Sequence, residues 1–372
     1  MTITVEDSDL LRATVRAALG KLSSSADVRR AMESPLGYEE PVWRRLAREL
    51  GLAGLTLPEE LGGSGLTEDE LGIAFEEAGA SLLCAPLFAT AGLALPLLQA
   101  IGDEAAIARY GPAIAGGELT ATVALAENAG RWQPDMVRCT ASRVRSGWML
   151  DGFKNYVVDG ASAGLILVVA LADGELGVFA VQGDAPGLGR EQLVTLDQTR
   201  KQARLAFVAT PAERVGSGDA AAAIARATAV SRALLAAEQA GGAQRCLDMT
   251  VDYAKTRIQF GRPIGSFQAV KQRLAEMLVQ VESARSAALA AVTAAAANDP
   301  ELEHVAAVAA LTCGEAYTWV TAQTIQLHGG IGFTWEHDAH LYFKRARSSA
   351  QLLGTPSELA DLIGQQLEVL IN

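Results

Sequence analysis

Three long, alanine-rich segments in the last two fifths of the chain constrain the fold more than any other feature. They are residues 222–257, 267–297 and 302–327. Alanine favours helix and lets neighbouring helices approach closely, which is typical of an antiparallel bundle. Pro300 separates the second segment from the third, and a last helix is expected after Thr355. We therefore predict a C-terminal α-helical bundle over residues 216–372.

The middle of the chain has a different pattern. Short β-branched or alternating runs follow one another from Thr120 to Pro211: TATVAL, RCTASRVRSGWMLDG, LILVVA, LGVFAV and ARLAFV. Glycine-rich and Asp-Gly turns separate them, as expected for strands. We predict a middle β-domain over residues 119–215.

The first third is again helical in pattern. Apolar residues recur at helical spacing, with helices expected at 5–22, at 39–52 and around Ile107. Thr67 and Glu70 form a T-x-x-E capping box that begins a further helix. These patterns predict an N-terminal α-helical domain over residues 1–118. The fold class is therefore mostly α with a central β-domain.

Composition excludes several classes of protein. The 372 residues carry a net charge of -12 and show no basic stripe, which argues against nucleic-acid binding. The cysteines lie far apart without a C-x-x-C pair, which predicts buried free thiols in a reducing cytoplasm and no metal site. They are Cys84, Cys139, Cys246 and Cys313.

One uncharged segment, residues 78–102, is long enough to cross a bilayer. Pro86 and Pro96 interrupt it, so a pair of core helices is the preferred interpretation. The acidic start of the chain has no signal-peptide pattern. We expect a cytoplasmic protein.

Two short motifs carry residues suited to a dinucleotide. The first is RIQFG at 257–261, followed by Gln268, and the second is QLHGGIG at 326–332. An arginine presents a planar fork to a diphosphate, and a phenylalanine presents a flat apolar face. Consecutive glycines let the backbone approach a phosphate, although Gly329 after a long helix equally suits a helix C-cap.

With LARELGLAGLTLPEELGGSGLT near the N-terminus, these motifs make the chain resemble the FAD-dependent acyl-CoA dehydrogenases over nearly its whole length. It looks like a divergent bacterial member. The resemblance implies an N-terminal helical domain, a middle β-barrel-like domain and a C-terminal four-helix bundle that builds the oligomer. It also implies α,β-dehydrogenation of an acyl-CoA thioester to the 2-enoyl-CoA, with electron-transferring flavoprotein as the acceptor.

The resemblance assigns cofactor roles to both motifs. In the family, the matching side chains grip the diphosphate and adenine side of an FAD that is bound mainly to a neighbouring subunit. The residues of this chain that match are Arg257, Phe260, Gln268, Gln326, Gly329 and Gly330.

The β-domain departs from the family pattern. The family loop T-E-P-x-A-G-S-D, which binds the flavin ring and the thioester tail, is rewritten here as AENAGRW at 126–132. Tyr156 replaces the tryptophan that flanks the flavin ring, and Val158 replaces a threonine that bonds flavin N5. Tyr156 retains a ring that can stack, whereas the side chain of Val158 has no hydrogen-bonding group.

Catalysis in the family needs a carboxylate that removes the α-proton. The usual glutamate is Leu353 here, and the alternative position, one residue before Arg232, is Ser231. Glu238 lies two helical turns beyond Ser231, about 10 Å along the axis, and is the candidate base. It is alternatively a structural partner of Arg245 or Arg232. Arg232 either steers the ligand or is structural.

Three functions remain open from the sequence. The chain is a working dehydrogenase with a displaced base, as a homotetramer or dimer. Alternatively it is a non-catalytic partner subunit that pairs with a complete paralogue in a heterotetramer and contributes FAD-binding elements to it; the family includes such unequal pairs in bacterial steroid side-chain degradation. A third option is a different reaction on an acyl-CoA.

Overall fold

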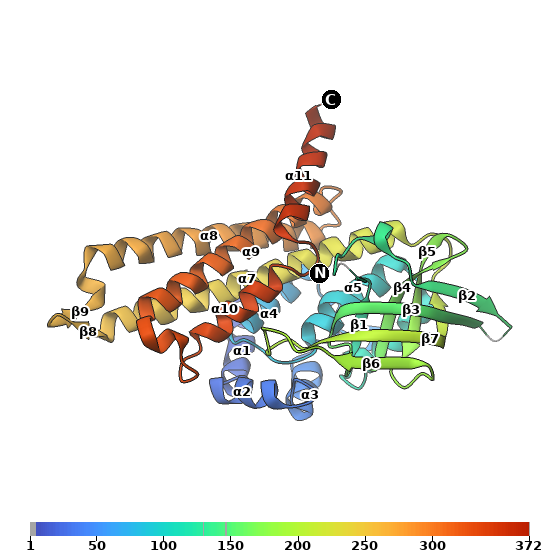
Figure 1. The fold of residues 1–372 in the computed structure, drawn as a ribbon, viewed down its shortest axis with the longest axis horizontal. Coiled ribbons are helices and arrows are strands. Elements are labelled where there is room, and N and C mark those ends of the chain that lie inside the picture. Colours follow the sequence, from blue (N-terminus) through green and yellow to red (C-terminus); the bar gives the residue numbers. More distant parts are fainter. Residues whose placement is uncertain (1–4, 129, 146, 372) are drawn as a thin grey trace. The chain divides into compact units, whose positions relative to one another are not determined.

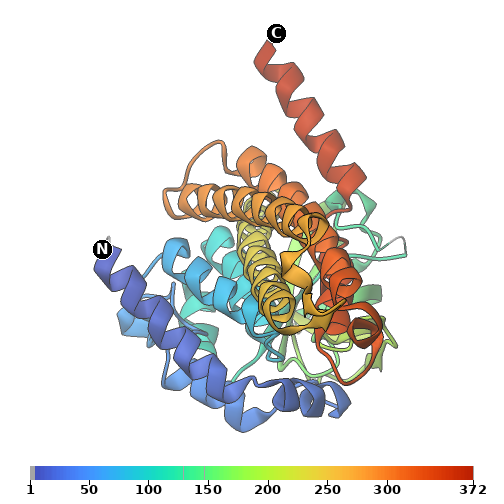
Figure 2. The same cartoon turned by 90° about the vertical axis from the view of Figure 1, so that its left-hand side faces the viewer.

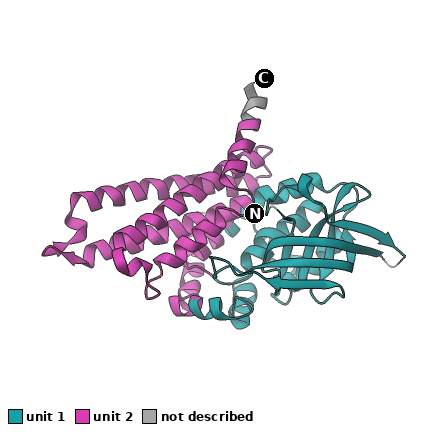
Figure 3. Cartoon of the chain, in the orientation of Figure 1, with its two compact units in different colours: residues 1–3, 29–71, 84–231 teal, residues 4–28, 72–83, 232–372 magenta. Residues whose placement is uncertain are grey.

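The computed structural model describes residues 5–128, 130–145 and 147–371, with side chains as far as residue 365. The chain divides into two compact units (Figure 3). We call the first the β-containing unit; it holds Arg29–Leu71 and Cys84–Ser231. The second is the helical unit, with Thr4–Val28, Gly72–Leu83 and Arg232–Asn372.

Helices precede and follow the strands along the chain (Figure 1). The first group is α1 (Val5–Leu22), α2 (Ser25–Glu33), α3 (Glu40–Arg48), α4 (Glu68–Ala80), the π-helix η2 (Phe88–Ala94), α5 (Leu95–Ile101) and α6 (Glu104–Ala115). The second group is α7 (Ala221–Thr256), α8 (Gln268–Ala296), α9 (Leu302–His328), α10 (Ala339–Ser349) and α11 (Pro356–Ile371). The predicted helices are present, and the mostly helical fold class with a central β-barrel-like sheet is confirmed. The three-domain boundaries stay a prediction.

The strands of the β-containing unit form one sheet. They are β1 (Ala121–Ala124), β2 (Thr140–Val144), β3 (Gly147–Val158), β4 (Leu165–Ala172), β5 (Glu175–Gln182), β6 (Leu188–Gln192) and β7 (Gln202–Val215). The order is β1-β4-β2-β3-β7-β5, and β4 also pairs with β5, which closes a barrel-like ring. β6 lies outside this order and pairs with β7. The sequence did not predict β6, because its residues LGREQ are mostly polar.

In the helical unit, α8 and α9 lie side by side and antiparallel (Figures 1 and 2). Glycines set the approach of α4 to α7. A Cβ on Gly79 would lie 1.9 Å from Glu238 O, and one on Gly241 would lie 1.8 Å from Glu76 O. Because no side chain fits at either position, the small residues at this crossing serve helix packing.

Two local predictions are confirmed. The capping box before α4 is formed, with Thr67 N and Oγ1 donating to Glu70 Oε2 at 2.8 and 2.7 Å. The four cysteines are buried free thiols. The uncharged segment 78–102 is split between α4, η2 and α5, and in the described part of the chain no helix is both long and apolar enough to cross a membrane.

Candidate functional site

The two predicted cofactor motifs lie at the same end of the helical bundle (Figure 1). After α7, the strands β8 (Ile258–Gln259) and β9 (Arg262–Pro263) form a hairpin whose turn is Phe260-Gly261. The rings of Tyr253, in the last turn of α7, and His328, the last residue of α9, stack 4.4 Å apart. The sequence therefore folds so that both motifs leave adjacent helix ends. We call this region the open end.

The side chains predicted to bind the cofactor are exposed at the open end. Phe260 is 92% exposed, at a φ of 53° that the hairpin turn requires. Within the described part of the chain, the guanidinium of Arg257 makes no hydrogen bond or ion pair. Gln268 and Gln326 are exposed as well. An exposed guanidinium can donate to a diphosphate, and an exposed ring can stack on an adenine.

The glycines of the second motif leave space beside the backbone. A Cβ built on Gly329 or on Gly330 meets no atom within 4 Å. Gly329 has φ 63° and ψ −142°, and its N–H bonds the carbonyls of Gln326 and Ile325. The helix-cap interpretation is thus confirmed. The open space beside both glycines leaves room for the approach of a phosphate, and the FAD-binding role stays a prediction.

Tyr156 lies at an irregularity of β3. The pairing of β3 with β7 shifts between Lys154 and Val157, and Tyr156 has a φ of 55°. Its ring is 46% exposed and covers Gly130, where a Cβ would lie 2.9 Å from the ring. Val158 is buried, so its side chain presents no group to a flavin.

A buried ion pair holds the rewritten loop of the β-containing unit. Lys154, with no exposed side-chain surface, donates to Glu127 Oε1 at 2.7 Å and to Leu125 O at 3.0 Å. Glu127 also accepts the backbone N–H groups of Arg138 and Cys139 at 2.9 Å. Burial pushes the pKa of Glu127 up, but these hydrogen bonds and the ammonium more than offset it and lower the pKa. One carboxylate thus joins both ends of the loop.

The two positions that the family resemblance predicts for a base, Leu353 and Ser231, have no carboxylate. Leu353 is buried, with a φ of 61°. Its carbonyl accepts a hydrogen bond from Arg232 Nε at 2.9 Å, and burial lowers the pKa of Arg232. Ser231 donates its hydroxyl to Ala227 O at 2.8 Å, within its own helix. Arg232 therefore has a structural contact, and its role toward a ligand stays a prediction.

Glu238 is buried in an ion pair inside the helical unit. Arg345 Nη1 donates to Glu238 Oε1 at 2.9 Å, and Arg345 Nη2 donates to Leu83 O at 3.2 Å. Both side chains are almost fully buried. This partner belongs to α10, a helix that the sequence did not predict, so the pairing of Glu238 with Arg345 was not anticipated. The role of Glu238 as a base stays a prediction.

An apolar chamber lies beside the rewritten loop in the β-containing unit. Its volume is about 10 Å³, and Trp132 and Ser231 are among its lining residues. A chamber of this size holds at most about one water molecule. It therefore has no room for an acyl chain as the structure stands.

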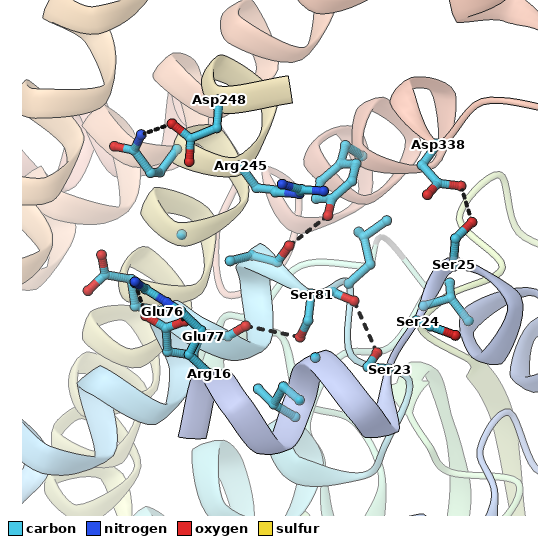
Figure 4. A pocket seen from close by; sticks show the side chains of 18 of the residues that line it. Arg16, Ser23, Ser24, Ser25, Glu76, Glu77, Ser81, Arg245, Asp248 and Asp338 are labelled. Atoms are coloured by element: carbon cyan, nitrogen blue, oxygen red, sulfur yellow. Dashed lines mark hydrogen bonds and ion pairs between the residues drawn. The ribbon is translucent and has the colours of Figure 1, made fainter. Parts of the chain in front are cut away.

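A larger cavity of about 520 Å³ lies in the helical unit (Figure 4). Its walls carry charged and hydroxyl side chains, and much of that charge is already paired. Arg16 makes two hydrogen bonds to Glu77 at 2.9 and 2.8 Å, and Gln244 donates to Asp248 at 2.7 Å. None of the residues predicted for the site lines this cavity. We place no site there.

Comparisons with known proteins cover almost the whole chain. The family model described as "Acyl-CoA dehydrogenase, N-terminal domain" matches residues 5–118, and the one described as "Acyl-CoA dehydrogenase, C-terminal domain" matches residues 220–368. The chain is 40% identical to acyl-CoA dehydrogenase IpdE2 of Mycobacterium tuberculosis over 354 residues, which is 95% of each chain.

The chain is also similar to two solved structures whose names each join two proteins. A variant of the Tcur3481-Tcur3483 steroid ACAD has a TM-score of 0.87 at 32% identity, covering 98% of both chains. The ChsE4-ChsE5 complex from Mycobacterium tuberculosis has a TM-score of 0.89 at 28% identity, covering 99% of both chains.

Proposed function

This chain belongs to the acyl-CoA dehydrogenase family of flavoproteins, and we propose that it is the partner subunit of a heteromeric acyl-CoA dehydrogenase. In this role it contributes its open end to an FAD bound mainly by a paralogue, and the paralogue carries out the α,β-dehydrogenation. The residues that hold the FAD are Arg257, Phe260, Gln268, Gln326, Gly329 and Gly330.

The observation that carries the proposal is a mismatch within one chain. The open end keeps an exposed ring, glycines with open space beside them, and a guanidinium that has no hydrogen bond or ion pair among the residues that the structure describes. The positions for a base hold Leu353 and Ser231, which have no carboxylate, and Glu238 is engaged by Arg345. A subunit that contributes to a neighbour's cofactor needs the first set and not the second.

The similar complexes support the proposal. The names Tcur3481-Tcur3483 and ChsE4-ChsE5 each describe two different chains, and the first is called a steroid ACAD. We therefore propose a steroid-derived acyl-CoA as the substrate class of the heteromer, with electron-transferring flavoprotein as its electron acceptor.

The test is to purify the chain alone and together with a candidate paralogue, and to record visible spectra before and after adding acyl-CoAs without oxygen. We expect a colourless chain alone, and a yellow complex that bleaches with steroid-derived acyl-CoAs. A chain that is yellow and bleaches by itself overturns the proposal and restores the alternative of a self-sufficient dehydrogenase with a displaced base.

A further inference from the structure

The apolar chamber of the β-containing unit is walled almost entirely by hydrocarbon. Its lining comes from η2, α5, β4, the start of α7 and the segment around β1: Leu93, Leu97, Val123, Leu125, Trp132, Val169, Ile224, Ala227, Thr228 and Ser231. Most of these side chains are fully buried. Such walls suit an apolar ligand, yet only about 10 Å³ stays open.

Trp132 has a fixed hydrogen bond at this chamber. Its indole Nε1 donates to Thr228 Oγ1 at 3.1 Å, and the same hydroxyl donates to Ile224 O at 2.7 Å. The threonine hydroxyl thus accepts from the indole while its own proton stays on the helix backbone. Trp132 is partly buried, and this bond to a threonine of α7 fixes where its ring lies.

The loop that carries Trp132 is itself anchored. Glu127 begins the segment and accepts the N–H groups of Arg138 and Cys139, eleven and twelve residues along the chain. Lys154 neutralises the carboxylate from inside the sheet. The loop is therefore held at both ends, and the indole is held between them.

We propose that Trp132 is a built-in occupant of this chamber, and that it excludes an apolar acyl chain from the chain's own site. This inference rests on the proposed function and deepens it. The other wall residues are mostly apolar and buried, and the indole lies among them where a ligand would need space. Removing the indole opens a space for a flat aromatic or an acyl chain.

Chemical complementation with free indole tests the occupant directly. In the full-length chain, Trp132→Ala is expected to lower the unfolding temperature, and indole is expected to restore at least half of the loss, saturating at one indole per chain. The wild-type chain is expected to show no response. The matched control is Trp335→Ala, which removes a tryptophan that is 59% exposed and is expected to give no indole-dependent rise. An indole effect equal in both variants, or absent in both, overturns the proposal.

A second ligand tests the acyl part of the inference. Octanoyl-CoA titrated by calorimetry into the full-length chain is expected to bind Trp132→Ala at least tenfold more tightly than wild type. Equal binding overturns the claim that the indole excludes an acyl chain.

A milder variant covers the case in which Trp132→Ala does not fold. Thr228→Val is close in volume and removes the acceptor of the indole N–H. In nitrogen-15 NMR spectra, the Trp132 indole N–H is expected to exchange with solvent at least tenfold faster in this variant. Unchanged exchange overturns the bonded placement of the ring.

These outcomes are separable from those of the proposed function. Indole binding is measured on the chain without flavin, whereas the proposed function depends on colour and bleaching in the complex. If the wild-type chain is yellow and bleaches by itself while Trp132→Ala binds indole, the partner role is rejected and the proposal that Trp132 occupies the chamber is retained. If the wild-type chain is colourless and Trp132→Ala does not bind indole, the proposal that Trp132 occupies the chamber is rejected and the partner role is retained.

Discussion

The open end of the helical unit and the chamber of the β-containing unit differ in how far their side chains are exposed and bonded within the chain. At the open end, Arg257 is exposed and Phe260 is 92% exposed. At the chamber, the indole of Trp132 is hydrogen-bonded and the loop around it is fixed by a buried ion pair. We infer that the exposed side chains of the open end bind another molecule, whereas the hydrogen-bonded and ion-paired side chains around the chamber stabilise this chain. The contrast predicts that substitutions at the chamber and in the core change folding, and substitutions at the open end change binding alone.

The largest effect is expected from Lys154→Met. It leaves the Glu127 carboxylate buried without its ammonium partner, which is expected to reduce the free energy of unfolding by about 3–5 kcal/mol in chemical denaturation. Lys255→Met is the matched control, because Lys255 is 70% exposed and pairs with the exposed Asp252; it is expected to change stability by less than about 0.5 kcal/mol. Equal effects in the two variants contradict the contrast.

The pH dependence of this pair has a definite sign. Because the folded-state pKa of Glu127 is lowered from 4.5, its contribution to stability is present above pH 4.5 and is lost as the pH falls below that value. The Lys154→Met variant is expected to show a weaker loss of stability in the same acid range.

Glu238→Gln is expected to have the next largest effect. The substitution keeps the shape and one acceptor but removes the charge facing Arg345, so the free energy of unfolding is expected to fall by about 2–3 kcal/mol. Glu282→Gln, at an ion-paired side chain that is 54% exposed, is the control and is expected to change little. A Glu238→Gln chain of normal stability, in a complex that no longer bleaches, would favour the catalytic role of Glu238 over the structural one.

Arg257→Ala is expected to leave the unfolding of the chain unchanged and to weaken retention of FAD by the complex by about 10- to 100-fold, the range for a lost charge-assisted hydrogen bond. The measurement is flavin released on dilution, followed by fluorescence. Arg262→Ala is the matched control, because Arg262 lies in the same hairpin and its guanidinium stacks 4.1 Å from the Phe267 ring. We expect less than about a threefold change there. A similar loss for both variants would mean that the hairpin, and not Arg257, holds the cofactor.

Sequence patterns predicted the regions governed by local physics. The bounds of α1 and the start of α9 follow from apolar periodicity, and the Thr67 cap follows from its spacing to Glu70. The cofactor motifs were found because glycine and arginine have distinct chemistry even without a structure. Their placement at one bundle end needed only the antiparallel order of the helices.

The interactions of the core were less predictable. Arg345 lies in the run KRARSS, which reads as a solvated face, and only the fold shows that it is buried against Glu238. Trp132 and Thr228 are 96 residues apart, and no local pattern joins them. Long-range pairs of polar groups depend on tertiary packing, which a single sequence does not encode in any short window.

The smallest effect is expected from His328, which links the open end to the folded core. Its Nδ1 lies 2.7 Å from Thr324 O and therefore carries the proton, whereas its Nε2 is buried without a hydrogen-bond partner in the part of the chain that the structure describes. Burial lowers the pKa of His328 below 6.5, with a smaller lowering from His337. The unfolded chain therefore takes up a proton near pH 6.5 that the folded chain does not, so stability is full above pH 6.5 and declines as the pH falls through this value.

His328→Phe keeps a ring against Tyr253 and removes the titration, so the slope of stability against pH between 7.5 and 5.5 is expected to flatten. An unchanged slope would mean that His328 does not couple proton uptake to folding, and that the open end is separated from the core more sharply than its contacts indicate.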